Sequence, residues 1–146
     1  MRMFNWRFVA LMVLFFSSSI TVSANDDEAQ IRAVVMDYFE GIGEGSYEKL
    51  SNAFHVKSRM LTSEKDDEGK AYLRIWEMEP TIKRWSKSTP PKRERTGEIL
   101  NMHIMDGRLA SVSFDLNGSY FDLLTLTKMD GQWKIISKAF IRQNKE

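Results

Sequence analysis

The sequence contains no cysteine among its 146 residues. This absence excludes disulfide bonds, thiolate zinc sites, iron–sulfur ligation, cysteine nucleophiles and lipid attachment to a cysteine. The two histidines, His55 and His103, are not at metal-ligand spacing and are too few for a histidine-rich site. The P-loop, GxGxxG, HExxH, EF-hand and GxSxG motifs are also missing. We therefore expect no required metal and no cofactor.

Neither sign of charge is in excess. Lysine and arginine number 21 against 20 acids, for a net charge of +1. This balance argues against a nucleic-acid partner, and the basic run at 92–95 is too short to change that. An apolar fraction of 42% with 12% aromatic residues predicts a globular chain with a real core.

The first 24 residues have the pattern of a secretory leader. Arg2 and Arg7 precede the apolar stretch Phe8–Phe16, and small residues follow it up to Ala24. As a helix this stretch would cover roughly 14 Å, about half of a bilayer core. We predict cleavage after Ala24, with no stable membrane anchor afterwards, and export to a bacterial periplasm or the exterior. Residues 25–146 would then form a single domain.

Helical periodicity dominates the first part of this domain. Residues 26–42 carry apolar side chains at three- and four-residue spacing and predict an amphipathic helix. Ser46 is placed to cap a short second helix. A short strand is expected at 59–62 and a solvated loop at 64–69. Residues 70–85 predict a third helical stretch, with a kink or two short helices meeting near Glu79-Pro80.

The remainder of the chain predicts an antiparallel meander. Four apolar segments are separated by Asp106-Gly107, Asn117-Gly118 and Asp130-Gly131, which favour two-residue hairpin turns. The expected strands are 98–105, 108–116, 119–129 and 132–142. Helices followed by such a sheet define an α+β class.

Two-residue turns would also fix which side chains share a face. They pair Met105 with Arg108, Leu116 with Ser119 and Met129 with Gln132. Asp122 then lies on one face among small residues, which leave room for a ligand beneath the helices. This small-residue set is Ser111, Ser113, Ser137 and Ala139. A single bulge would shift these pairs.

With this register, both faces of the expected sheet are largely apolar, although a meander in contact with solvent normally has one polar face. We therefore expect the helices to cover one face and a second subunit to cover the other, giving a homodimer. Asp122 could act as a general base or fix a ligand donor. Alternatively, it bonds to nearby serines or a helix terminus, or lies in water at the rim.

Three segments of the chain resemble a known family. They are YFEG (38–41) with GSYEKL (45–50); AFH (53–55) with Arg59; and FDLLTL (121–126) with DGQWKI (130–135) and Lys138. Val56-Lys57 stands where the family usually has Pro-Asp. In order and spacing, these segments resemble the putative lumazine-binding family of the nuclear transport factor 2-like superfamily.

This resemblance implies a cone-shaped, cystatin-like α+β fold, in which N-terminal helices pack on a curved antiparallel sheet over a cavity. It also implies frequent dimerisation through the sheet. It does not imply lumazine as the ligand. Relatives in the superfamily include steroid isomerases, dehydratases and non-catalytic binding domains, so fold alone does not decide function.

The candidate ligand-binding residues are Tyr38, His55, Arg59, Trp76, Trp85, Ser113 and Asp122. Asp122 and His55 are also the candidates for proton transfer. Each has a purely structural alternative: His55 could satisfy carbonyls at a helix end, Arg59 could form a surface ion pair, and the aromatic residues could be plain core.

Three functions remain open. The leading one is an exported, non-catalytic domain that binds a small apolar or aromatic ligand. The second is an enzyme of the ketosteroid-isomerase or dehydratase type, using Asp122 or His55 for proton transfer. The third is an assembly or regulatory module that uses its sheet face for partners.

Overall fold

The computed structural model describes residues 24–89 and 94–143. The expected leader therefore lies outside the described residues except for Ala24, as do Lys92 and Arg93 of the basic run. Within the described part, no helix is both long and apolar enough to span a membrane.

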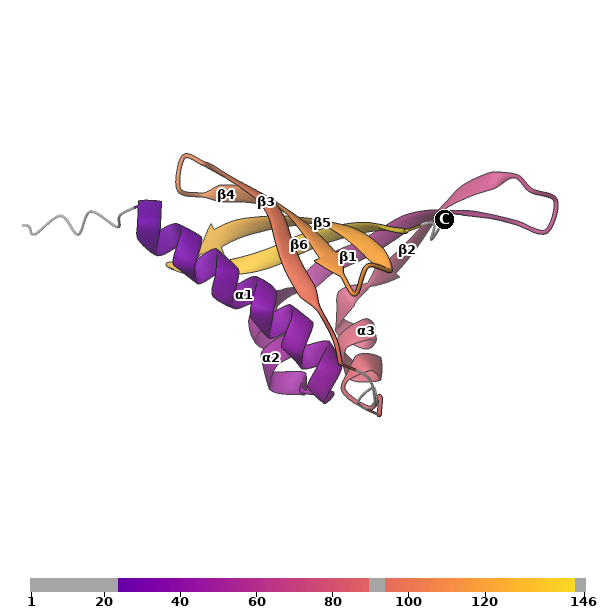
Figure 1. Cartoon of the computed structure of the whole chain (residues 1–146), viewed down its shortest axis with the longest axis horizontal. Helices are drawn as coiled ribbons and strands as arrows, with labels where there is room; N and C mark the ends of the chain where they lie inside the picture. Colours follow the sequence, from indigo (N-terminus) through magenta and orange to yellow (C-terminus); the bar gives the residue numbers. More distant parts are fainter. Residues whose placement is uncertain (1–23, 90–93, 144–146) are drawn as a thin grey trace, which may run out of the picture.

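The two N-terminal helices follow the predicted pattern. Helix α1 (Ala24–Glu44) runs obliquely below the sheet (Figure 1) and ends at Gly45, whose φ of +66° suits glycine. Helix α2 (Tyr47–Ala53) begins directly afterwards, and the Ser46 side chain accepts a hydrogen bond from Lys49 N at 3.3 Å. The predicted cap at Ser46 is confirmed.

The sheet contains six strands rather than four. The predicted meander is present as β3 (Gly97–Met105), β4 (Leu109–Leu116), β5 (Tyr120–Met129) and β6 (Gln132–Arg142). Strands β1 (Phe54–Lys65) and β2 (Ala71–Glu77) extend it, giving the order β2-β1-β6-β5-β4-β3. Only the β1–β6 pair is parallel among the described strands.

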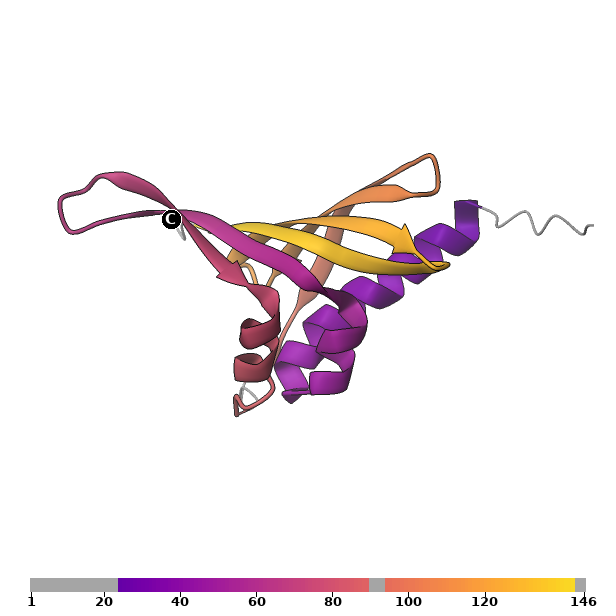
Figure 2. The same ribbon diagram turned by 180° about the vertical axis from the view of Figure 1, so that it is seen from behind.

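The prediction of a helix over residues 70–85 is wrong for its first half. Residues 71–77 form β2, which pairs with the outer part of β1 in a hairpin that projects beyond the body (Figures 1 and 2). Only α3 (Met78–Trp85) is helical. Pro80 lies in its first turn, where the missing N–H has no helical partner to lose, so the predicted kink does not form. The expected strand at 59–62 is part of β1, which also includes Glu64 and Lys65 from the expected loop.

The predicted strand register is correct at one of the three turns and is wrong by one residue at the other two turns. Met129 pairs with Gln132 as expected, but Met105 pairs with Leu109 and Leu116 with Tyr120. At these two turns, the carbonyl of the residue after the glycine accepts a hydrogen bond from a backbone N–H outside the hairpin. Arg108 O accepts from Lys128 N at 3.0 Å, and Ser119 O accepts from Gln143 N at 2.9 Å.

A bulge in β6 causes the third change of register. Thr125 pairs with Ser137 and Leu126 with Ile135, so Ile136 is an extra residue in β6. Beyond the bulge, Asp122 lies opposite Phe140 on one side and Phe114 on the other. The small-residue gap predicted around Asp122 is therefore wrong: Ser113 pairs with Leu123 and lines a groove on the opposite face.

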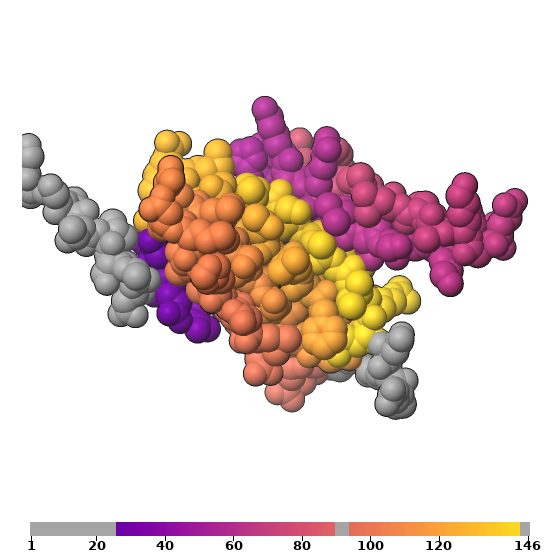
Figure 3. Space-filling view, turned by 90° about the horizontal axis from the view of Figure 1, so that it is seen from above, coloured from indigo at the N-terminus to yellow at the C-terminus, as the bar shows by residue number. Residues whose placement is uncertain are grey.

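The hydrophobic core lies between the three helices and the inner face of the sheet. Its fully buried members include Ile31 and Tyr38 from α1, and Phe114 and Leu124 from the sheet. The outer face is formed by strands (Figure 3) and retains exposed apolar side chains such as Leu123 and Ile141. The N-terminal helices packed on one face of the sheet confirm the predicted α+β architecture.

Candidate functional site

The candidate site is built on a buried polar network between α1 and the sheet. Tyr38 Oη donates a hydrogen bond of 2.7 Å to Asp122 Oδ2, and Lys138 Nζ forms an ion pair with Asp122 Oδ1. The exposed fraction of the side chain is 0% for Asp122 and 5% for Lys138. Both carboxylate oxygens therefore have a partner from the protein itself.

The surroundings determine the protonation of the two partners. Burial, reinforced by the negative charge of Asp122, raises the pKa of Tyr38 well above its ordinary value. Tyr38 therefore remains a neutral donor. Burial lowers the pKa of Lys138, while the charge and hydrogen bonding of Asp122 oppose that change. The Lys138 ammonium also lies 5.3 Å from the ring centroid of Tyr38 and 4.9 Å from that of Phe140, close enough for cation–π attraction.

A pocket of about 230 Å³ adjoins this network. Its walls are mostly aromatic and aliphatic, and Lys138 is the charged residue among them. The lining residues described by the structure are Tyr38, Ile42, Met60, Trp85, Leu116, Tyr120, Lys138 and Phe140. Because helices α1 and α3 and strands β1, β4, β5 and β6 all contribute, the pocket depends on the whole fold.

The aromatic residues around the pocket contact one another. The ring centroids of Tyr38 and Trp85 are 6.3 Å apart, and those of Tyr120 and Phe140 are 5.9 Å apart. Phe54 lies edge-on to Tyr38 at 5.3 Å. This packing holds the side chains in place and gives the pocket flat walls on which a planar molecule could stack.

Tyr38, Trp85 and Asp122 are the predicted site residues that the structure brings together. Lys138, which the sequence analysis did not propose, completes the group. The expected register placed Lys138 on the opposite face from Asp122, and the Ile136 bulge brings both to the inner face. The place of Lys138 among the motif residues that resemble the family was the available signal.

Three other predicted residues lie away from this pocket. His55 Nδ1 accepts a hydrogen bond from Lys57 N at 3.2 Å, near the start of β1. Arg59 is mostly exposed and forms a surface ion pair with Glu77 at 3.1 Å. Trp76 packs on Phe140, with ring centroids 5.9 Å apart, and is absent from the described lining.

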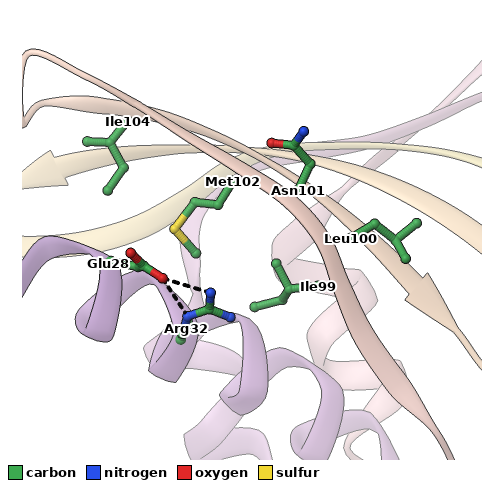
Figure 4. Close-up of a pocket in the computed structure, with 7 residues that line it drawn as sticks. All are labelled: Glu28, Arg32, Ile99, Leu100, Asn101, Met102 and Ile104. Carbon is green, nitrogen blue, oxygen red and sulfur yellow. Dashed lines mark hydrogen bonds and ion pairs between the residues drawn. The ribbon is translucent and has the colours of Figure 1, made fainter. Parts of the chain in front are cut away.

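A second depression, of about 570 Å³, lies between α1 and the edge strand β3 (Figure 4). Ile99 and Met102 project from β3 toward the helix, while Asn101 points away from it. At the rim, Arg32 and Glu28 form an ion pair at 2.7 Å, with both side chains about half exposed. Because these charges satisfy each other in water, this groove is a weaker candidate for a small-molecule site.

No metal centre is built by the described residues, among which no group of three or more His, Cys, Asp or Glu side chains could hold an ion.

A third groove of about 570 Å³ lies on the outer face of the sheet and includes Ser113, Phe121 and Leu123.

Helices on one face of a curved sheet, with a pocket between the layers, define a nuclear transport factor 2-like, or cystatin-like, α+β protein. More narrowly, the chain belongs to the family described as "Putative lumazine-binding", whose sequence model matches residues 26–141. Both findings agree with the resemblance identified from the sequence.

The solved structures that resemble the chain confirm this fold. A nuclear transport factor 2-like protein of unknown function from Silicibacter pomeroyi has a TM-score of 0.70 at 18% identity, covering 83% of this chain and 99% of its own. A similar protein from Shewanella baltica has a TM-score of 0.69 at 20% identity, covering 84% and 98%. A third, from Methylobacillus flagellatus, has a TM-score of 0.67 at 26% identity, covering 86% and 98%. No curated protein matches the chain.

Proposed function

We propose that this protein binds a small, flat, mostly apolar molecule in the pocket beside Tyr38, Trp85 and Lys138, without catalysing a reaction. The observation that carries this proposal is the pocket of about 230 Å³, in which the described walls are mostly aromatic and aliphatic and Lys138 is their charged residue. Drug-sized ligands occupy pockets of roughly 300–1,000 Å³. This smaller volume suits one ring or two fused rings. The family description, which names lumazine, supports the same size class.

The contacts of Asp122 support a binding role over a catalytic one. A general base needs a free oxygen within reach of the substrate proton. Asp122 Oδ2 accepts from Tyr38, and Oδ1 is paired with Lys138. His55, the other candidate for proton transfer, lies outside the described pocket lining. An isomerase or dehydratase remains the second candidate because Asp122 does lie on the inner face of the sheet.

Ligand-observed NMR with naphthalene and coumarin tests the proposal. In the Leu116→Trp variant, a large side chain at the pocket wall should abolish binding of both probes. Val56→Trp is the matched control because Val56 is 54% exposed and lies outside the pocket. Equal binding by both variants and the unchanged protein would contradict the location of the site. Absence of binding by the unchanged protein would contradict the function.

We also propose that a second copy of the chain covers the outer face of the sheet. The outer groove is lined mainly by apolar residues, of which Leu123 is 52% and Ile141 60% exposed. Its lining also includes the small, uncharged residues Ser113 and Ala139. A broad exposed apolar surface of this kind is typical of an interaction site. Asp122 is the charged residue of its described lining, and its side chain is 0% exposed, so the exposed surface favours a like apolar surface over a charged partner.

Light scattering at micromolar concentration tests this dimer. The unchanged protein should have twice the mass of one chain, and Leu123→Lys should reduce it to one. Val56→Lys introduces the same charge at a similarly exposed strand position outside the groove and should remain dimeric. A monomeric unchanged protein, or loss of the dimer in both variants, would contradict the proposal. Capture of a different protein by a monomer would favour the assembly-module function instead.

Finally, we propose export with cleavage after Ala24, on the basis of the leader pattern in residues 1–24. Cleavage there would leave the described hydrophobic core intact, because Ile31 is its first member within residues 24–89 and 94–143. Intact-mass measurement of the protein from its native host should give the mass of residues 25–146. A species that retains the leader would contradict this proposal.

A further inference from the structure

The charges of the described pocket lining and of the ion pair beneath it balance; Arg95, whose charge also acts on Tyr38, lies outside that lining. Lys138 is the charged residue of the described lining, and the fully buried carboxylate of Asp122 compensates it. Tyr38, the third member of the network, is neutral. A ligand that brought its own negative charge would therefore add an uncompensated charge to a desolvated site, which is unfavourable.

Hydrogen bonding beneath the pocket, in contrast, is not saturated. An ammonium group has three N–H donors, and Asp122 is the acceptor recorded for Lys138 among residues 24–89 and 94–143. The rings of Tyr38 and Phe140 attract the charge but do not replace an oxygen acceptor. The Tyr38 hydroxyl proton is already donated to Asp122. Lys138 is therefore the charged group of the described lining that can donate to a ligand, and the Tyr120 hydroxyl is a neutral donor beside it.

From these two observations, and resting on the proposed binding function, we infer that the pocket selects an uncharged, flat ring bearing a carbonyl-type acceptor. Lys138 is the specificity-determining residue. It donates to the acceptor, while Asp122 cancels the positive charge that would otherwise attract a carboxylate. The ring itself packs against the aromatic walls formed by Trp85, Tyr120 and Phe140.

Three probes of similar size separate the contributions of shape, acceptor and charge. Naphthalene has the flat shape alone, coumarin adds an uncharged carbonyl, and 2-naphthoate adds a negative charge. Calorimetric titration of the unchanged protein should give a Kd for coumarin at least about tenfold lower than for either other probe, which is the effect expected of one hydrogen bond from a charged donor.

Two variants test the role of the ion pair. Asp122→Asn removes the compensating charge and should reverse the preference, so that 2-naphthoate binds more tightly than coumarin. The double variant Asp122→Asn/Lys138→Met removes both charges and should bind coumarin no more tightly than naphthalene. Near-UV circular dichroism establishes whether each variant has folded. If a variant does not fold, the affinities of the unchanged protein for the three probes test the selection by Lys138.

The outcomes distinguish this inference from the function on which it rests. Equal affinity for the three probes, abolished by Leu116→Trp, would leave the binding function standing and overturn the selection by Lys138. Tighter binding of 2-naphthoate than coumarin by the unchanged protein would overturn it as well. Absence of binding by all three probes would overturn both.

Discussion

Replacing Tyr38 by phenylalanine tests the buried network with the smallest change in shape. The substitution deletes only the hydroxyl that donates to Asp122 Oδ2 at 2.7 Å. Tyr38 is fully buried, and Asp122 is 2% exposed, so water has little access to replace the lost donor. A hydrogen bond to a charged group contributes about 1.5–3 kcal/mol, and an unsatisfied buried acceptor adds to the loss. We expect the free energy of unfolding to fall by about 2–3 kcal/mol.

Urea denaturation measures this loss directly. The midpoint should fall by roughly 1–2 M while the m-value stays constant. Tyr120→Phe is the matched control: Tyr120 also lines the pocket, but its hydroxyl has no recorded hydrogen-bond partner in the described chain. Its substitution should change the free energy by no more than about 0.5 kcal/mol. Equal effects of the two substitutions would refute the assignment of Tyr38 as the essential donor to Asp122.

Three further substitutions test other parts of the account. Asp27 accepts hydrogen bonds from Lys128 Nζ at 2.6 Å and Trp133 Nε1 at 2.9 Å, which lower its pKa. The ionised Asp27 should therefore add to the free energy of unfolding at neutral pH, and this contribution should disappear as the pH falls below about 3.8 through the folded-state pKa. Asp27→Asn should reduce the free energy of unfolding at pH 7 by about 2 kcal/mol and weaken its dependence on pH in acid. Gly97→Ala should destabilise the fold by about 1–3 kcal/mol in urea melts, because the new Cβ would lie 2.6 Å from Phe114 Cζ; an unchanged midpoint would contradict this close packing. Arg59→Ala should change the Kd for coumarin by no more than about twofold, since the Arg59–Glu77 pair is exposed. A tenfold loss of affinity would show that Arg59 contributes to the binding site.

Local signals made the two N-terminal helices and the turns of the meander predictable. The Asp106-Gly107, Asn117-Gly118 and Asp130-Gly131 turns all occur where the sequence indicates, with positive φ at every one of these six residues. The cap at Ser46 is equally local, since its partner is Lys49. The resemblance to the nuclear transport factor 2-like superfamily, carried by short ordered motifs, supplied the cone-shaped architecture.

The errors arose where distant segments decide the outcome. Leu73 and Trp76 fit a helical spacing, but pairing of β2 with β1 makes that segment extended. The register at Arg108 depends on Lys128, a residue far along the chain. The Ile136 bulge, which no dipeptide signals, brings Lys138 to Asp122 and moves Ser113 away. Tyr38, Trp85 and Asp122 were accessible to sequence reasoning through the core pattern and the family motifs. Lys138 also belongs to those motifs, but the expected register placed it on the opposite face from Asp122.

The most direct test of the pocket is a crystal structure of the protein grown with coumarin. We predict coumarin density against the rings of Trp85 and Phe140, with the carbonyl oxygen within hydrogen-bonding distance of Lys138 Nζ and the Tyr38–Asp122 contact retained. Coumarin bound instead in the groove between α1 and β3 or on the outer face of the sheet, with the pocket beside Lys138 filled by protein side chains, would contradict the account.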